Sequence, residues 1–117
     1  MNLPLQITFR HMEHSPALEE RIRKLMLRLE KFSEHILRCH VVVEVPHQHS
    51  RQGRLYKLRI EITVPTEEIV IDRAHPRDHS HEDSYVELRD LFRATRRKLE
   101  DYERKRRHQV KTHVGLL

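Results

Sequence analysis

The spacing of apolar residues changes its period several times along the chain. In residues 3–10 (LPLQITFR), every second side chain is apolar, which is typical of a strand with one buried face. Residues 15–32 show helical spacing instead: Ser15 suits the N-cap, Pro16 suits the first helical position, and an apolar stripe follows. The beginning of the chain is therefore predicted to form a strand and then an amphipathic helix.

Three segments rich in β-branched residues follow this helix. They are residues 39–45 (CHVVVEV), 54–64 (RLYKLRIEITV) and 68–74 (EIVIDRA). Polar connections separate them, so we expect three strands in an antiparallel meander. Helical spacing returns between Tyr85 and Tyr102, which predicts a long second helix.

The order β-α-β-β-β-α supplies strands that each offer one apolar face and two amphipathic helices that must cover it. We therefore predict an α+β fold, a two-layer sandwich in which both helices pack on one face of a four-stranded sheet. The length of 117 residues suits a single domain, which we place at residues 1–110. Residues 111–117 (KTHVGLL) lack a hydrophobic period and are expected to form a frayed tail.

The cysteine content and the absence of long apolar runs indicate the cellular compartment. Cys39 is the single cysteine, so an internal disulfide is excluded, and its place on the apolar side of a strand predicts a core residue. No segment approaches the roughly 20 apolar residues of a membrane span, and the N-terminus lacks the pattern of a signal peptide. These features predict a cytoplasmic protein without a membrane partner.

The chain is basic, with 23 Lys and Arg residues against 18 Asp and Glu residues, a formal net charge of +5 and a pI of about 9.7. Such a balance indicates a polyanionic partner, either nucleic acid or an anionic membrane surface. At about 100° per helical position, the basic residues gather on one flank of each predicted helix. They are Arg21, Lys24, Arg28 and Lys31 in the first helix and Arg89, Arg93, Arg96, Arg97, Arg104 and Arg107 in the second.

Basic flanks of this kind often belong to ordinary solvent-exposed helices, in which Lys and Arg stems cover the edge of the core. Two helices that segregate charge in the same way, on the same face of one sheet, favour nucleic-acid binding instead. The second helix is rich in arginine, whose planar guanidinium suits bidentate phosphate contacts. A broad basic surface recognises the shape of folded RNA rather than its base sequence.

The histidine-rich loops offer a metal site as an alternative. His47, His49, His79 and His81 are weak candidates for zinc ligands, because they lack the cysteine partners and fixed spacing of structural zinc sites. We expect no metal and no other cofactor. The sequence contains no Gly-rich phosphate loop and indicates no apolar pocket that would tune a catalytic carboxylate. We therefore expect no catalytic residues, no small-molecule substrate and no enzyme activity.

Three stretches resemble the ribosome hibernation factor family, also called ribosome-associated inhibitor or protein Y. They are residues 15–32, 35–45 and 81–100. The first stretch ends in a run that is similar to the Lys-Leu-Glu-Lys-aromatic run of the family, and the third opens with a similar acidic pair and tyrosine. The matching residues are Arg28, Leu29, Glu30, Lys31 and Phe32 in the first run and Glu82, Asp83 and Tyr85 in the third. The similarity extends over residues 3–107.

The resemblance implies a non-enzymatic factor that binds the small ribosomal subunit at its decoding channel, inhibits translation in stationary-phase or stressed cells and keeps ribosomes stored. It implies that basic residues at matching positions contact ribosomal RNA phosphates. These are Arg28, Lys31, Arg97 and Lys105. The chain resembles the short form of the family, and we expect a monomer off the ribosome. A general module for structured, double-stranded RNA is the alternative function, and a metal protein with histidine loops is less favoured.

Overall fold

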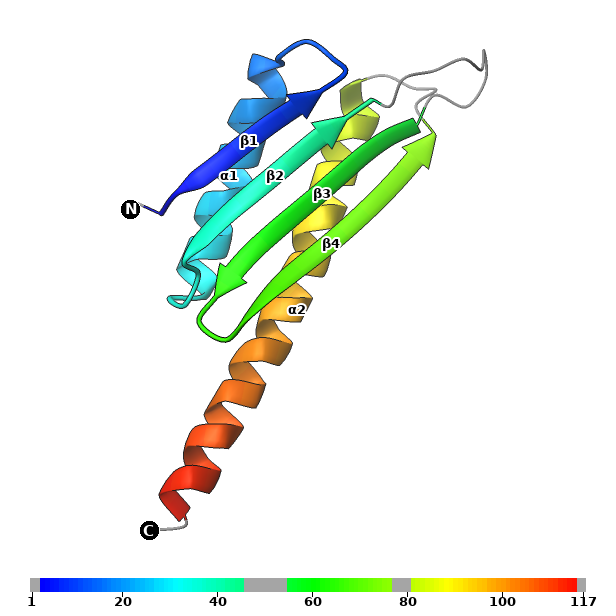
Figure 1. The fold of residues 1–117 in the computed structure, drawn as a ribbon. Helices are drawn as coiled ribbons and strands as arrows, with labels where there is room; N and C mark the ends of the chain where they lie inside the picture. Colours follow the sequence, from blue (N-terminus) through cyan, green and yellow to red (C-terminus); the bar gives the residue numbers. More distant parts are fainter. Residues whose placement is uncertain (1–2, 46–54, 77–80, 116–117) are drawn as a thin grey trace.

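The structure, a computed structural model, describes residues 3–45, 55–76 and 81–115. These residues form four strands and two helices in the predicted order β-α-β-β-β-α (Figure 1). The elements are β1 (Leu5–Arg10), α1 (Pro16–Phe32), β2 (Arg38–Glu44), β3 (Leu55–Val64), β4 (Glu67–Pro76) and α2 (His81–Gly115). The predicted α+β class is confirmed.

The strands form one sheet in the order β1-β2-β3-β4. β2, β3 and β4 form the predicted antiparallel meander, whereas β1 pairs with β2 in parallel. The parallel pairing follows from the connection, because α1 carries the chain back along the sheet between β1 and β2. The register places Ile7, Val41 and Ile60 side by side on the face that packs against the helices.

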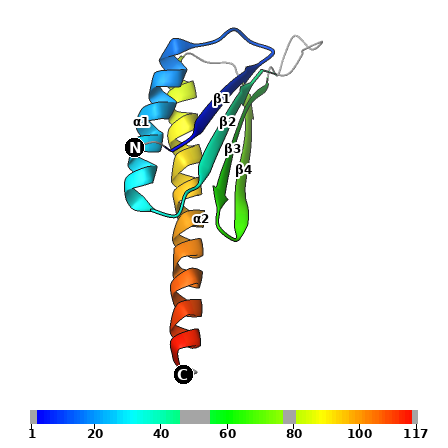
Figure 2. The same ribbon diagram turned by 60° about the vertical axis from the view of Figure 1, so that its left-hand side comes forward.

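Both helices cover the same face of the sheet, as predicted, and they run side by side (Figures 1 and 2). α1 begins as the sequence indicates: Ser15 Oγ accepts a hydrogen bond from the Leu18 amide at 3.3 Å, and Pro16 is the first helical residue. The two layers meet in one hydrophobic core. Its residues include Leu18, Ile22, Leu25, Met26 and Leu29 of α1, Cys39, Val41, Val43, Leu58, Ile60, Ile62 and Ile69 of the sheet, and Leu88, Leu91, Phe92, Leu99 and Tyr102 of α2.

α2 is 35 residues long and extends past the end of the sheet (Figure 1). Its buried apolar stripe ends at Tyr102, because beyond this point there is no sheet to cover. The backbone is helical to Gly115, although the sequence from residue 111 onward is aperiodic, and the frayed tail at residues 111–117 stays a prediction. An α-helix continues through local backbone hydrogen bonds without an apolar stripe, so hydrophobic spacing gives no signal for this extension. A domain boundary at residue 110 stays a prediction.

Cys39 lies in the core, as predicted, with 1% of its surface exposed. Burial raises the pKa of its thiol to about 12, so the group stays protonated and is a packing residue, not a nucleophile. The neighbouring His40 points to the opposite, open face of the sheet, where its Nε2 lies 2.8 Å from Thr8 Oγ1. In the described part of the chain, neither helix has the length and apolar character needed to cross a membrane.

Candidate nucleic-acid interface

Two aromatic contacts show how the basic flanks of the helices lie relative to each other. The Arg21 guanidinium of α1 lies 5.8 Å from the centre of the Tyr85 ring in α2. The Arg96 guanidinium of α2 lies 4.8 Å from the centre of the Phe32 ring in α1. The first contact joins the beginnings of the two helices and the second joins the end of α1 to the middle of α2, so the helices run parallel. The basic flank of each helix therefore lies toward the other helix.

Helical spacing assigns further basic residues to the same side. In α1 they lie three, seven and ten positions after Arg21, and in α2 they lie three and seven positions before Arg96. We call this region the interhelix surface. It consists of Arg21, Lys24, Arg28, Lys31, Arg89, Arg93 and Arg96. Arg97 and Arg104, which are seven positions apart, lie at the border of this surface.

Most of the cations in this region lack an acidic partner. Lys24, Arg28, Lys31, Arg93 and Arg97 are exposed, and none forms an ion pair with another described residue. Three other cations have weak, exposed pairs: Arg89 lies 4.0 Å from Asp90, Arg96 lies 3.8 Å from Glu100 and Arg104 lies 3.0 Å from Asp101. The positive charge is therefore largely uncompensated and is available to phosphates.

Arg21 differs from the other members of the interhelix surface. Its side chain is half-buried, and its Nε has no hydrogen-bond partner among the described residues. The guanidinium instead lies over the ring of Tyr85, a contact that attracts the two helices to each other. The geometry thus gives Arg21 a supporting position between the helices, whereas its basic neighbours face solvent.

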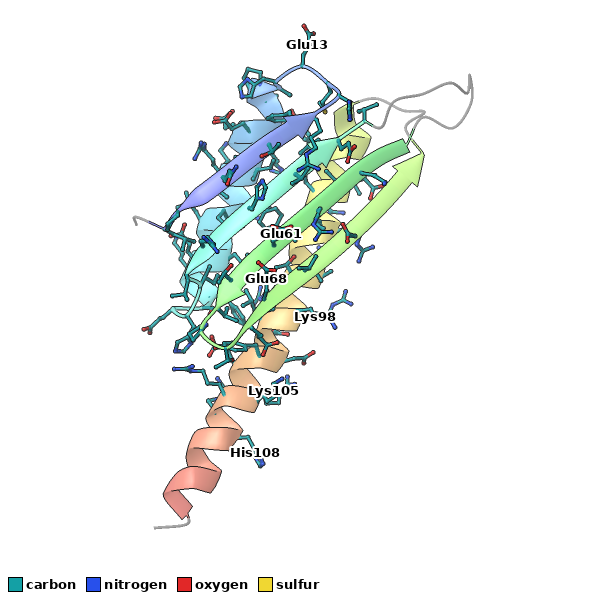
Figure 3. All side chains as sticks on the ribbon, viewed as in Figure 1. Glu13, Glu61, Glu68, Lys98, Lys105 and His108 are labelled. Carbon is teal, nitrogen blue, oxygen red and sulfur yellow. The ribbon has the colours of Figure 1, made fainter. Side chains whose placement is uncertain are left out.

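Lys105 lies on another side of α2, toward the sheet. Its Nζ is 3.6 Å from Glu67 Oε2 at the start of β4, and Figure 3 shows it where α2 leaves the sheet. On the same side, a hollow of about 520 Å³ lies between α2 and β4, lined in part by Arg97 and Lys98. The basic residues singled out in the sequence are therefore not all brought together, because one helical position turns a side chain by about 100°.

Two neighbouring carboxylates of α2 have different relations to the interhelix surface. Glu100 pairs with Arg96 and lines a hollow of about 560 Å³ beside Phe32, at the end of α1. Asp101 lines the hollow on the β4 side. Glu100 therefore interrupts the interhelix surface, whereas Asp101 lies outside it.

A half-buried carboxylate, Glu103, fixes the position of α2 against the segment that follows α1. Ser33 Oγ donates a hydrogen bond to Glu103 Oε2 at 2.6 Å, and His35 Nδ1 lies 2.7 Å from the same oxygen. Burial alone would raise the pKa of Glu103, but the hydrogen bonds from Ser33 and His35 outweigh it and lower the pKa below its usual value. Sequence reasoning missed this cluster, because its members are about 70 positions apart and share no local pattern.

The open face of the sheet carries charges of both signs, and one of its cations is paired with two acids. The other exposed cations of this face form no ion pair with a described residue; they are Arg10, Arg38 and Lys57. Arg59 Nε donates to Glu61 Oε2 at 2.8 Å, and its Nη1 donates to Asp72 Oδ2 at 2.9 Å. The hydrogen bond from Arg59 is the main cause that lowers the pKa of Glu61. The other oxygen of Glu61 lies 3.4 Å from His40. A hollow of about 730 Å³ on this face is lined by both signs of charge.

The candidate zinc ligands lie beyond what the structure describes. His47, His49 and His79 lie outside the described residues, and nothing is described for the side chain of His81. Within residues 3–45, 55–76 and 81–115, no group of three or more His, Cys, Asp or Glu side chains is arranged to hold a metal ion.

The model of the family described as "Sigma 54 modulation protein / S30EA ribosomal protein" matches residues 5–107. The chain belongs to this family. The match includes both basic helix flanks as far as Arg107 and confirms the resemblance to the ribosome hibernation factors. Membership indicates a ribosome-associated protein, and such factors are generally non-enzymatic.

Two solved structures share the fold. A ribosomal subunit interface protein from Coxiella burnetii is 18% identical, with a TM-score of 0.68, and the alignment covers 86% of this chain and 98% of that one. The N-terminal domain of protein Y from Thermus thermophilus is 16% identical, with a TM-score of 0.65 and coverage of 87% and 99%. No curated protein matches the chain. At these identities the likeness shows a common architecture.

Proposed function

We propose that the protein is a non-enzymatic ribosome hibernation factor that binds ribosomal RNA of the small subunit near the decoding channel and inhibits translation. The observation that carries this proposal is the set of exposed, unpaired cations along two parallel helices in a member of a ribosome-associated family. In this role the protein acts in the cytoplasm of stationary-phase or stressed cells, as a monomer when it is off the ribosome.

The physical basis is recognition of phosphates on folded RNA. Ribosomal RNA presents phosphates from several strands, and a broad basic surface fits such a shape without reading bases. Arginine contributes bidentate contacts, and lysine contributes point charges. A protein with extents of 63 × 27 × 20 Å that lies in the decoding channel would exclude messenger and transfer RNA sterically. Inhibition by this route needs no chemical step.

The residues have different roles in this proposal. Lys24, Arg28, Lys31, Arg93 and Arg97 contact phosphates directly, since they are exposed and unpaired. A second, supporting set of basic residues either keeps the helices in place or contacts phosphates after RNA displaces a weak acidic partner. This set is Arg21, Arg89, Arg96, Arg104 and Lys105.

Sedimentation of a stationary-phase lysate through sucrose gradients tests the proposal. The protein is expected to migrate with small subunits and whole ribosomes at low salt and to leave them at high salt, because each neutralised phosphate adds about 0.7 to 0.9 to the slope of log affinity against log salt. Protein that stays at the top of the gradient at low salt would contradict the proposal. Equal affinity for small subunits and for an unrelated RNA duplex would favour the general RNA-binding module instead.

A further inference from the structure

α2 continues beyond the rest of the fold as a single helix. Its last ion pair to the sheet joins Lys105 to Glu67 at 3.6 Å. From there the helix runs to Gly115, ten further residues or about 15 Å at about 1.5 Å per residue. Figures 1 and 2 both show this end of α2 projecting past the sheet and past α1, and Figure 3 places His108 on it. We call residues 104–115 the basic arm.

The charge of the basic arm surrounds its axis. Four consecutive residues, Arg104 to Arg107, are basic, and at about 100° per position they project in four different directions. Arg104 pairs with Asp101 and Lys105 pairs with Glu67. Arg106 and Arg107 form no ion pair with a described residue. The arm is thus cationic on every side, unlike the earlier part of α2, which has one apolar side.

Two structural explanations do not fully account for this ring of cations. The helix dipole favours cations only in the last turn, and Arg107 lies eight residues before Gly115. Mutual support along the helix accounts for the ring only in part: Arg104 pairs with Asp101 and Arg106 Nη1 donates to Tyr102 Oη at 3.4 Å, but Arg104 and Arg107 are like charges three positions apart. A helix that rests on one RNA surface would use the cations on one side only. Cations on all sides can all contact phosphates only where RNA lies on more than one side of the helix.

We propose that the basic arm inserts between two phosphate backbones of structured RNA and makes a contact separate from the interhelix surface. This inference rests on the proposed function, which supplies the RNA partner. Arg104 lies one helical repeat after Arg97, so the arm continues the line of exposed cations and the same RNA can reach both. A helix with side chains is about 10–12 Å wide, which requires a cleft between RNA helices and makes the contact independent of base sequence.

Two double variants with equal loss of charge test the insertion. Arg104→Gln with Arg107→Gln removes cations from the side that continues the interhelix surface, and Lys105→Gln with Arg106→Gln removes them from the sides facing away from it. Binding to purified small ribosomal subunits is measured over a range of KCl concentrations. Insertion predicts that each double variant lowers the salt slope by about 1.4 to 1.8, since both pairs contact phosphates. A normal slope for the Lys105 and Arg106 variant would overturn the proposal.

Two controls separate RNA contact from structural effects and from the proposed function. Glu67→Gln removes the ion pair of Lys105 but keeps the cation, so its salt slope should equal that of the unchanged protein. An equal loss of slope in Glu67→Gln would show that Lys105 acts through the fold, and it would overturn insertion. If the unchanged protein does not bind small subunits, the proposed function fails. If the unchanged protein and the Lys105 and Arg106 variant bind small subunits with the same salt slope, insertion of the basic arm is refuted but the proposed function is not.

Discussion

The two faces of the molecule carry similar residues in different electrostatic states. On the open face of the sheet, Arg59 lies between Glu61 and Asp72 and donates hydrogen bonds to both. On the helical face, Lys24 and Arg93 are exposed without an acidic partner among the described residues. Charged residues alone therefore do not mark a nucleic-acid surface. The distinguishing property is whether acids lie among the cations, as Glu44, Glu61 and Asp72 do on the open face.

The largest loss of stability is expected from a change in the core, which supports both faces. Leu91 is fully buried in the core between α2 and the sheet, and Leu91→Ala should lower the free energy of unfolding by about 2–5 kcal/mol. Urea unfolding measures this loss. Leu27→Ala is a matched control, because Leu27 is 52% exposed and should change stability by less than about 0.5 kcal/mol. Equal losses would show that the core is misplaced.

A smaller loss of stability is expected when the contact between α2 and the segment after α1 is removed. Glu103→Gln removes the carboxylate that accepts the Ser33 hydrogen bond and contacts His35, so it should cost about 1–3 kcal/mol of unfolding free energy. Because this change shifts α2 against the end of α1, we expect weaker binding to small subunits by the folded protein as well. Unchanged stability would contradict the anchoring role of Glu103.

The same carboxylate gives a pH dependence with a defined sign. The pKa of Glu103 is lowered in the folded protein, so its contribution is complete above the unfolded value of about 4.3 and is lost as the pH falls through the lower folded value. Unfolding measured between pH 7 and pH 3 should show a steeper acid-side loss in the unchanged protein than in Glu103→Gln. Parallel curves would exclude Glu103 as a source of acid sensitivity.

A modest effect is expected when the open face loses its acids. Glu61→Gln with Asp72→Asn frees Arg59 and should change stability by no more than about 1 kcal/mol, since the pairs are largely exposed. The freed guanidinium should add salt-sensitive binding to an RNA duplex, with a slope larger by about 0.7 to 0.9. A variant with no added RNA binding would show that the acids of the open face are not what distinguishes the two faces.

The smallest effect concerns the carboxylate within the interhelix surface. Glu100→Gln removes the partner of Arg96 and should increase the salt slope of binding to small subunits by at most about 0.9. Glu68→Gln, an exposed site on the open side of the sheet, changes the net charge equally and should leave the slope unchanged. An equal increase in both variants would indicate a general effect of net charge.

The sequence predicted those parts of the fold that depend on local spacing. Alternation in β2 and the apolar stripe of α1 report which side chains are buried, and Ser15 with Pro16 marks the start of a helix. The helical end of α2 escaped prediction, because a helix without a packing partner needs no apolar period. The parallel pairing of β1 with β2 was not predicted either, since it depends on the path of the chain through α1.

The candidate site was predictable only as far as each helix could be considered alone. The basic flank of α1 follows from the spacing of Arg21, Arg28 and Lys31, but its position toward α2 depends on tertiary packing. The same limit explains why Lys105 falls on the side of β4. Local pairs such as Arg96 with Glu100 follow from helical spacing, but the tertiary pairs do not, because the partners Asp72 of Arg59 and Glu67 of Lys105 lie on β4.

A comparison of two charge-matched triple variants tests the central claim most directly. One carries Arg93→Glu, Arg96→Glu and Arg97→Glu on the helical face, and the other carries Arg10→Glu, Arg38→Glu and Lys57→Glu among the exposed cations of the sheet. Both have the same net charge, and circular dichroism confirms that each is folded before its affinity for small ribosomal subunits is measured. The account predicts that the helical-face variant loses binding while the sheet variant retains most of it. Equal losses, or a larger loss in the sheet variant, would contradict the account.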